Sequence, residues 1–186
     1  MKWLDDHKAV PSDMTNAVLA AATRDGDRAL FDRFLTAAKA EKDRQQRGRI
    51  INSLGGFRNP ELVREAQKVG MSDAFDARES LFLLFAGFGD PSTRRMPFEF
   101  VRDNYDAVMK RVPNAITGGG GSFIPQVAGG FCSAAERKEA SDFFEERMKQ
   151  VEGGPRVLAQ VLEGITLCEA RRNGQRASVA AFLEKY

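Results

Sequence analysis

The phrase GFRNP occurs at residues 56–60, and a close copy, GFGDP, occurs at residues 87–91. Their starting positions, 56 and 87, differ by 31 residues, which is about the length of one helical hairpin. In each phrase glycine favours the end of one helix, and Asn or Asp followed by proline favours the N-cap and first residue of the next. The repeated phrase therefore predicts helical hairpins stacked on one another.

The rest of the chain agrees with this interpretation. Apolar residues recur at helical spacing in almost every segment, and no segment shows the sustained alternation typical of strands. We therefore expect an all-α fold of roughly ten helices, arranged as a curved superhelix of the HEAT or armadillo kind. We also expect residues 1–186 to form a single α-helical domain that is the C-terminal fragment of a longer chain, because the first residues resemble the tail of a helix.

Several helix boundaries can be placed from local chemistry. Ser133 and Glu136 form a capping-box pattern at the start of a helix that we expect to run to about Val151. The sequence GGP at residues 153–155 separates this helix from the next, and the Asn-Gly pair at 173–174 is expected to end that one before a final short helix. The helix between these two boundaries has an apolar stripe of Val157, Leu158, Val161, Leu162, Ile165 and Cys168.

The glycine-rich stretch TGGGGSFIPQVAGGF, at residues 117–131, does not have the features of a phosphate-binding loop. Such a loop needs a lysine and a Ser or Thr where the helix opens, and a dinucleotide-binding loop must follow a strand. We expect a flexible connection between two hairpins, with Ser122 as a helix cap and Pro125 in the first turn of the following helix.

Composition is that of an ordinary globular protein, with 186 residues of which 42% are hydrophobic and 29% charged. The 28 basic and 26 acidic residues are mixed along the whole length, so no basic face predicts a nucleic-acid partner. The longest apolar run, residues 81–88, is too short to span a membrane, and the N-terminus is too acidic for a secretory signal. We expect a soluble protein without membrane association, of unknown compartment.

Residues able to support catalysis are scarce. There is one histidine, His7, near the N-terminus, so neither a zinc site nor a histidine-activated nucleophile can be assembled. The two cysteines, Cys132 and Cys168, are either buried reduced thiols or the two halves of a single disulfide, and both interpretations stay open. Adjacent acids such as Glu145 and Glu146 diverge around a helix and are expected to be solvated. We predict no catalytic residue, metal ligand or cofactor in this chain.

Three phrases stand in a characteristic order: INSLGGFRNPEL at residues 51–62, FEFVRDNYD at 98–106, and the phenylalanine pair at 143–144. Together they resemble the C-terminal helical domain of the zinc aminopeptidases that include the puromycin-sensitive, alanyl and endoplasmic-reticulum enzymes. The resemblance covers nearly the entire chain. Pro97 or Phe98 stands where the family usually has tryptophan, Tyr105 replaces the second tryptophan, and Leu167 with Cys168 takes the place of an aromatic pair. These differences affect the closeness of the relationship rather than the fold.

The resemblance implies a non-catalytic domain of a metallopeptidase, a hydrolase that acts in proteolysis. This domain would cover the catalytic domain and enclose the cavity for the peptide substrate. The family's zinc motif, H-E-x-x-H, is missing here, so zinc would belong to the catalytic domain of the parent enzyme. The implied partners are that upstream domain and the peptide, and the isolated chain is expected to form a homodimer through exposed apolar surface. The alternative is a free-standing HEAT-like adaptor that binds another protein.

Three residues are the candidates for the substrate cavity. The family often has V-R-x-Q-D at a helix start, and the sequence ARESL at residues 77–81 keeps the arginine, so the resemblance implies that Arg78 faces the cavity and binds a peptide carboxylate. The alternative for Arg78 is a salt bridge to an acid such as Asp76. Phe123 and Gln126 are the other two candidates, and the alternative for Phe123 is core packing.

Overall fold

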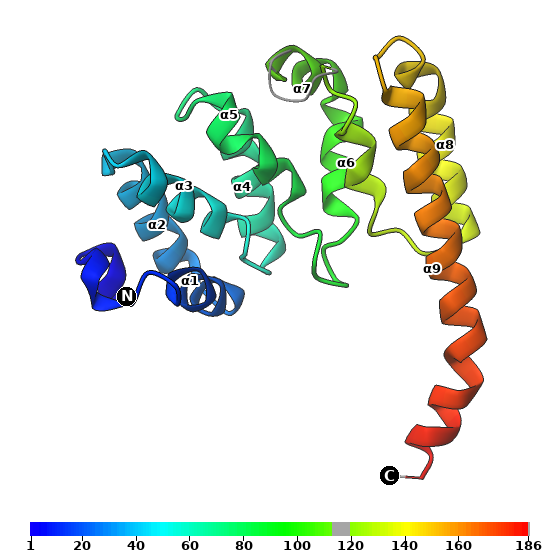
Figure 1. Ribbon diagram of the computed structural model, residues 1–186, viewed down its shortest axis with the longest axis horizontal. Helices are drawn as coiled ribbons and strands as arrows, with labels where there is room; N and C mark the ends of the chain where they lie inside the picture. Colours follow the sequence, from blue (N-terminus) through cyan, green and yellow to red (C-terminus); the bar gives the residue numbers. More distant parts are fainter. Residues whose placement is uncertain (113–119, 186) are drawn as a thin grey trace. The chain divides into compact units, whose positions relative to one another are not determined.

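The structure, a computed structural model, describes residues 1–112 and 120–185 (Figure 1). Over these ranges it contains nine α-helices, four short 3-10 helices and no strand, which confirms the predicted all-α fold of stacked hairpins. The helices group into two compact units, Met1–Pro113 and Asn114–Tyr186. The sequence predicts a single domain over residues 1–186, and this statement stays a prediction, because a division into two compact units does not test it.

The first unit is built from short helices that pack against their neighbours in the sequence. Its elements are η1 (Lys2–Leu4), η2 (His7–Ala9), α1 (Thr15–Arg24), α2 (Arg28–Ala40), α3 (Arg44–Leu54), α4 (Pro60–Met71), α5 (Ala77–Ser80), η3 (Leu81–Phe85), α6 (Met96–Asp103) and α7 (Tyr105–Arg111). Helix α2 packs on α3, and α4 packs on η3, α5 and α6. Phe57, from the first repeated phrase, lies edge-on to Phe31 and Phe34 in the core, with ring centroids 5.2 and 6.2 Å away.

The two repeated phrases lead into different local structures. After the first, Asn59 caps α4 by accepting the N–H of Glu61 at 2.8 Å, as predicted. After the second, no helix begins at Pro91, so that prediction is wrong. Asp90 instead accepts the N–H of Ser92 at 2.9 Å and closes a local turn, and α6 begins only at Met96.

The two phrases nevertheless lie against each other, as stacked hairpins require. Arg58 of the first phrase pairs with Asp90 of the second, with Nε and Oδ2 3.1 Å apart. Gly87 has a φ of +84°, and a Cβ added there would lie 2.9 Å from Val63 Cγ1 and 3.0 Å from Thr93 Oγ1. Glycine is therefore needed at this position for both its backbone conformation and the space that it leaves.

Among residues 120–185, the second unit has three helical elements: η4 (Ile124–Ala128), α8 (Ala134–Met148) and α9 (Gly154–Leu183). Ser133 is confirmed as the cap of α8, because its Oγ accepts the N–H of Glu136 at 3.3 Å. The Glu136 carboxylate accepts the N–H of Cys132 at 2.9 Å, one residue before the N–H of Ser133 that a capping box would use. Helix α8 ends at Met148, slightly before the predicted boundary. Pro155 lies in the first turn of α9, as the GGP sequence predicted.

Helix α9 runs alongside α8 and continues beyond it to Leu183 (Figure 1). The predicted break at residues 173–174, and the separate short helix after it, are therefore wrong. A glycine inside a helix costs only about 1 kcal/mol relative to alanine, and no proline follows to stop the helix. Of the predicted stripe, Leu158, Val161 and Ile165 are buried, whereas Cys168 is exposed.

The two cysteines form a disulfide, Cys132–Cys168, with their Cα atoms 5.1 Å apart. The interpretation as buried reduced thiols is therefore wrong, and the alternative of a single disulfide is confirmed. The bond links the residue before the α8 cap to the middle of α9.

Part of the glycine-rich stretch, residues 117–119, lies outside the described residues. Phe123 is the N-cap of η4 and makes no side-chain capping bond, so the prediction of Ser122 as a cap is wrong. Pro125 does lie in the first turn, but the turn belongs to a 3-10 helix.

Candidate functional site

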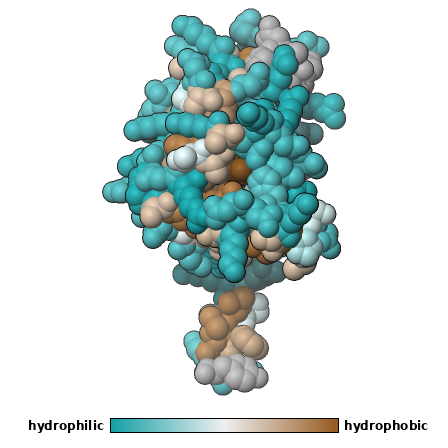
Figure 2. All heavy atoms as spheres, turned by 90° about the vertical axis from the view of Figure 1, so that its left-hand side faces the viewer, coloured by the Kyte–Doolittle hydropathy of each residue, from teal (hydrophilic) through white to brown (hydrophobic). Residues whose placement is uncertain are grey.

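The C-terminal half of α9 is a surface rather than part of a core. Every residue from 170 to 185 is exposed, a length of about 24 Å at the helical rise of 1.5 Å per residue. Val179, Phe182 and Leu183 are 51% to 66% exposed, although they are large and apolar. Figure 2 shows the end of α9, at the bottom of the view, coloured mainly as hydrophobic. Apolar side chains gathered on an exposed helix are typical of a binding surface.

This exposed surface continues the face of α9 that is buried closer to its start. Val179 and Leu183 follow Ile165 by 14 and 18 residues, about four and five helical turns, so all three lie on one side of the helix. The Asn-Gly pair at residues 173–174 predicted a break in the helix, so this continuation was not expected from the sequence. The signal that could have revealed it was the position of Val179 and Leu183, which follow Ile165 by nearly whole numbers of helical turns.

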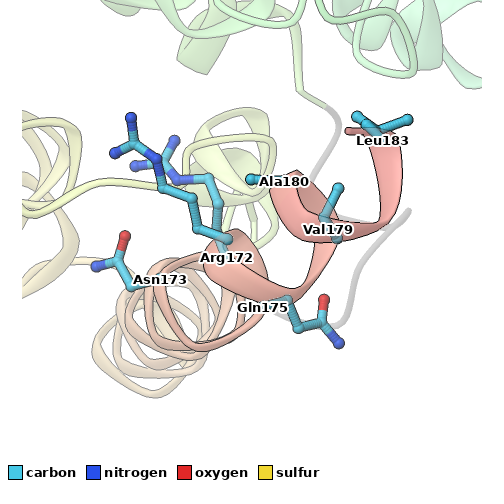
Figure 3. Close-up of a pocket in the computed structure, with 7 residues that line it drawn as sticks. Arg172, Asn173, Gln175, Val179, Ala180 and Leu183 are labelled. Atoms are coloured by element: carbon cyan, nitrogen blue, oxygen red, sulfur yellow. The ribbon is translucent and has the colours of Figure 1, made fainter. Parts of the chain in front are cut away.

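A hollow of about 620 Å³ lies on the same part of α9 (Figure 3). Its lining residues are Arg172, Asn173, Gln175, Arg176, Val179, Ala180 and Leu183. Figure 3 shows Val179, Ala180 and Leu183 on the last turns of the helix, which curve away from the turn that holds Arg172. Since all of the lining residues come from one helix, the hollow becomes an enclosed site only when a second surface covers it.

The charge of this surface is one-sided. Arg171, Arg172 and Arg176 lie on it, and no acidic residue occurs between 170 and 183. None of the three has an ion-pair partner within the part of the chain that the structure describes. A partner that carries carboxylates beside an apolar patch would complement this surface.

The residues predicted to face a substrate cavity are not brought together by any described contact. Arg78 is exposed on α5, and its backbone N–H, not its guanidinium, contacts Asp76 at 2.8 Å. Phe123 is half-buried before η4, and Gln126 is exposed on η4. Arg78 belongs to the first unit and the other two belong to the second. Their role in a cavity stays a prediction.

Side chains that could ligate a metal are scattered rather than clustered in the described part of the chain. Residues 1–112 and 120–185 contain no group of three or more His, Cys, Asp or Glu side chains that could hold a metal ion. His7 stacks on Trp3, with ring centroids 4.5 Å apart, and its Nε2 lies 3.5 Å from Glu41. Both cysteines are used in the disulfide. The described residues therefore do not fit a zinc site.

None of the described helices is both long and apolar enough to cross a membrane.

Comparisons with known proteins agree on one family. Residues 1–167 match the family described as ERAP1-like C-terminal domain. The chain is 24% identical over 153 residues to Probable aminopeptidase 1 of Saccharolobus solfataricus, which covers 80% of this chain and 19% of that protein. It is also 24% identical over 170 residues to Aminopeptidase M1-B of Oryza sativa subsp. japonica, covering 89% of this chain and 19% of that protein. The chain thus spans about a fifth of the length of the curated relatives that it matches.

Proposed function

The chain belongs to the family of ERAP1-like C-terminal domains, and from this membership we propose that it is the non-catalytic C-terminal domain of a zinc aminopeptidase. In this role it covers the catalytic domain and encloses the cavity that holds the peptide substrate. The match over residues 1–167 is the observation that carries the proposal. The names of the two curated relatives, both aminopeptidases, support it.

The proposal assigns the chemistry to another domain. The zinc ligands of the parent metallopeptidase are assigned to its catalytic domain, and the described residues of this chain contain no cluster of three or more His, Cys, Asp or Glu side chains that could hold the ion. Its contribution is a rigid helical wall that limits access to the substrate. Arg78 binds a peptide carboxylate in this proposal, and Phe123 and Gln126 line the cavity. The exposure of Arg78 and Gln126 is compatible with these roles.

The exposed face of α9 is proposed to contact the catalytic domain. Val179 and Leu183 supply apolar contact, and Arg171, Arg172 and Arg176 favour an acidic partner surface. In the absence of that partner the apolar residues offer a surface for a homodimer, although the arginines of two copies would repel each other. The same face also suits the second candidate function, an adaptor that binds an unrelated protein.

Two measurements test the proposal. The purified chain should not hydrolyse an aminoacyl chromogenic substrate, with or without added zinc, and robust hydrolysis would contradict the assignment. Co-purification with the catalytic portion of the proposed parent aminopeptidase should yield a complex. The double change Val179→Glu and Leu183→Glu should abolish it, whereas Met14→Glu, at a site 52% exposed in the first unit, should not. A reading frame without such a catalytic portion, combined with capture of a different partner, would favour the adaptor.

A further inference from the structure

A second hollow, of about 560 Å³, is an open groove between α4 and α6 of the first unit. Each helix presents one face to it, because the lining positions on α4 are 64, 67, 68 and 71 and those on α6 are 96, 99, 100 and 103. This i, i+3, i+4, i+7 spacing places the side chains of each helix in one row along the groove. The volume lies within the range of small-ligand sites.

The α4 side of the groove is basic. Arg64 and Lys68 are exposed, and four residues apart they repel each other weakly. Neither has an ion-pair partner among the residues that the structure describes. They form one charged rim of the groove.

The α6 side is acidic, with Glu99 and Asp103 at the same spacing. Each acid has a basic neighbour on its own helix or beside it: Glu99 lies 3.4 Å from Arg95, and Asp103 lies 3.0 Å from Arg102. These are partly exposed surface pairs, which contribute little and are easily exchanged. No described ion pair crosses from one rim to the other, so the opposite charges stay apart across open space.

The floor of the groove contains an orphaned polar atom. Gln67 is fully buried, and its Nε2 donates to the carbonyl oxygen of Ala86 at 3.4 Å. Its Oε1 has no hydrogen-bond partner within the described residues. Exchanging the two amide atoms would set Oε1 against the Ala86 carbonyl, so the acceptor is the atom left free. A buried acceptor without a donor is unfavourable, and a ligand N–H would satisfy it.

We propose that this groove binds a zwitterionic peptide of two or three residues by both of its ends. Helices in contact lie about 8–10 Å apart, and an extended chain spans about 3.3–3.6 Å per residue, so a peptide of this length reaches from rim to rim. Its carboxylate pairs with Arg64 and Lys68, and its ammonium pairs with Glu99 and Asp103.

The middle of the peptide meets the floor. An amide N–H of the peptide donates to Gln67 Oε1, and its apolar side chains pack on Met71, Met96 and Phe100. Because Oε1 is buried, the methionine side chains must shift to admit the peptide, and their flexible thioethers allow this. A ligand carrying only one sign of charge would meet one repulsive rim. This site goes beyond the enclosing role, since it lies within one unit of this chain and needs no catalytic domain.

Isothermal titration of the purified chain with leucyl-alanine tests the proposal from the ligand side. Saturable binding with one site is expected. N-acetyl-leucyl-alanine lacks the ammonium and leucyl-alanine amide lacks the carboxylate, so each should bind at least about tenfold more weakly. Absence of saturable binding up to roughly 10 mM would overturn the proposal, as would equal affinity for all three ligands.

Variants test it from the protein side. The double variant Arg64→Gln and Lys68→Gln should lower the affinity for leucyl-alanine at least about tenfold. Its affinity for leucyl-alanine amide should stay nearly unchanged, because the amide already lacks the carboxylate that Arg64 and Lys68 bind. A control that removes the same two charge types elsewhere, Lys39→Gln with Arg137→Gln, should bind like the parent chain. Equal loss of affinity for leucyl-alanine and its amide in the double variant would refute the assigned orientation. All of these titrations use this chain alone, so their failure would leave the proposed function untouched.

Discussion

Replacing Cys168 with serine is expected to destabilise the second unit by about 4 kcal/mol. The disulfide joins residues 36 positions apart. For a loop of this length the chain-entropy relation gives about 13 cal/mol/K, or about 4 kcal/mol at 25 °C, gained by restricting the unfolded chain. Cys168 is the better position for the change, because it is exposed whereas Cys132 is buried and would leave a hydroxyl in the core.

The assay is urea unfolding followed by circular dichroism at 222 nm. Under oxidising conditions Cys168→Ser should shift the midpoint down by more than about 1 M, and the parent chain in reductant should match the variant. Trp3 lies in the core of the first unit, so its fluorescence serves as an internal control and should shift much less. Equal midpoints for the variant and the oxidised parent would refute the reasoning. So would two free thiols in the native oxidised protein.

Three further changes address the first unit. Gly87→Ala should lower the free energy of unfolding by about 2 kcal/mol or more, since it adds a side chain at positive φ against Val63. Gly89→Ala is the control, because a Cβ at that position has open space and should not change stability. Similar melting temperatures for the two variants would contradict this reasoning. The pKa of Asp90 is lowered, mainly because its carboxylate accepts two hydrogen bonds from Ser92. The ionised Asp90 therefore stabilises the fold at a pH above its pKa in the unfolded chain, and this stabilisation is lost as the pH falls through its pKa in the folded protein. Asp90→Asn should therefore flatten the fall in stability below about pH 4, and an unchanged pH profile of thermal unfolding would refute this. Gln67→Leu should change stability by less than about 1 kcal/mol, because it removes the orphaned acceptor but also the long hydrogen bond to the Ala86 carbonyl. A loss above about 2 kcal/mol in urea unfolding would count against that description.

Local signals predicted the helix starts where the chemistry is complete within a few residues. Asn59 and Ser133 each accept an N–H of the first helical turn with their own side chains, and Pro60 has no N–H that needs an acceptor. Asp90 has the same side-chain chemistry as Asn59, yet it closes a turn with Ser92 and pairs with Arg58 from another hairpin. That choice depends on tertiary contacts, so the motif alone could not settle it.

The candidate binding surfaces could be identified only in the three-dimensional structure, because they too depend on tertiary contacts. The rows at Arg64 and Lys68, and at Glu99 and Asp103, are readable as helical faces, but only the packing of α4 beside α6 brings them to one groove. The pairing of the cysteines likewise depends on the fold. The exposed end of α9 was hidden by an Asn-Gly pair that the helix passes through without interruption.

A domain that encloses the substrate cavity of an aminopeptidase must change which peptides reach the active site. The most direct test is the rate of hydrolysis of peptides of increasing length by the catalytic portion of the proposed parent aminopeptidase, measured with and without this chain. We predict that adding the chain lowers kcat/KM for long peptides much more than for a dipeptide-sized substrate, because the helical wall limits access to the active site. A length profile that is unchanged by the chain would contradict the enclosing role.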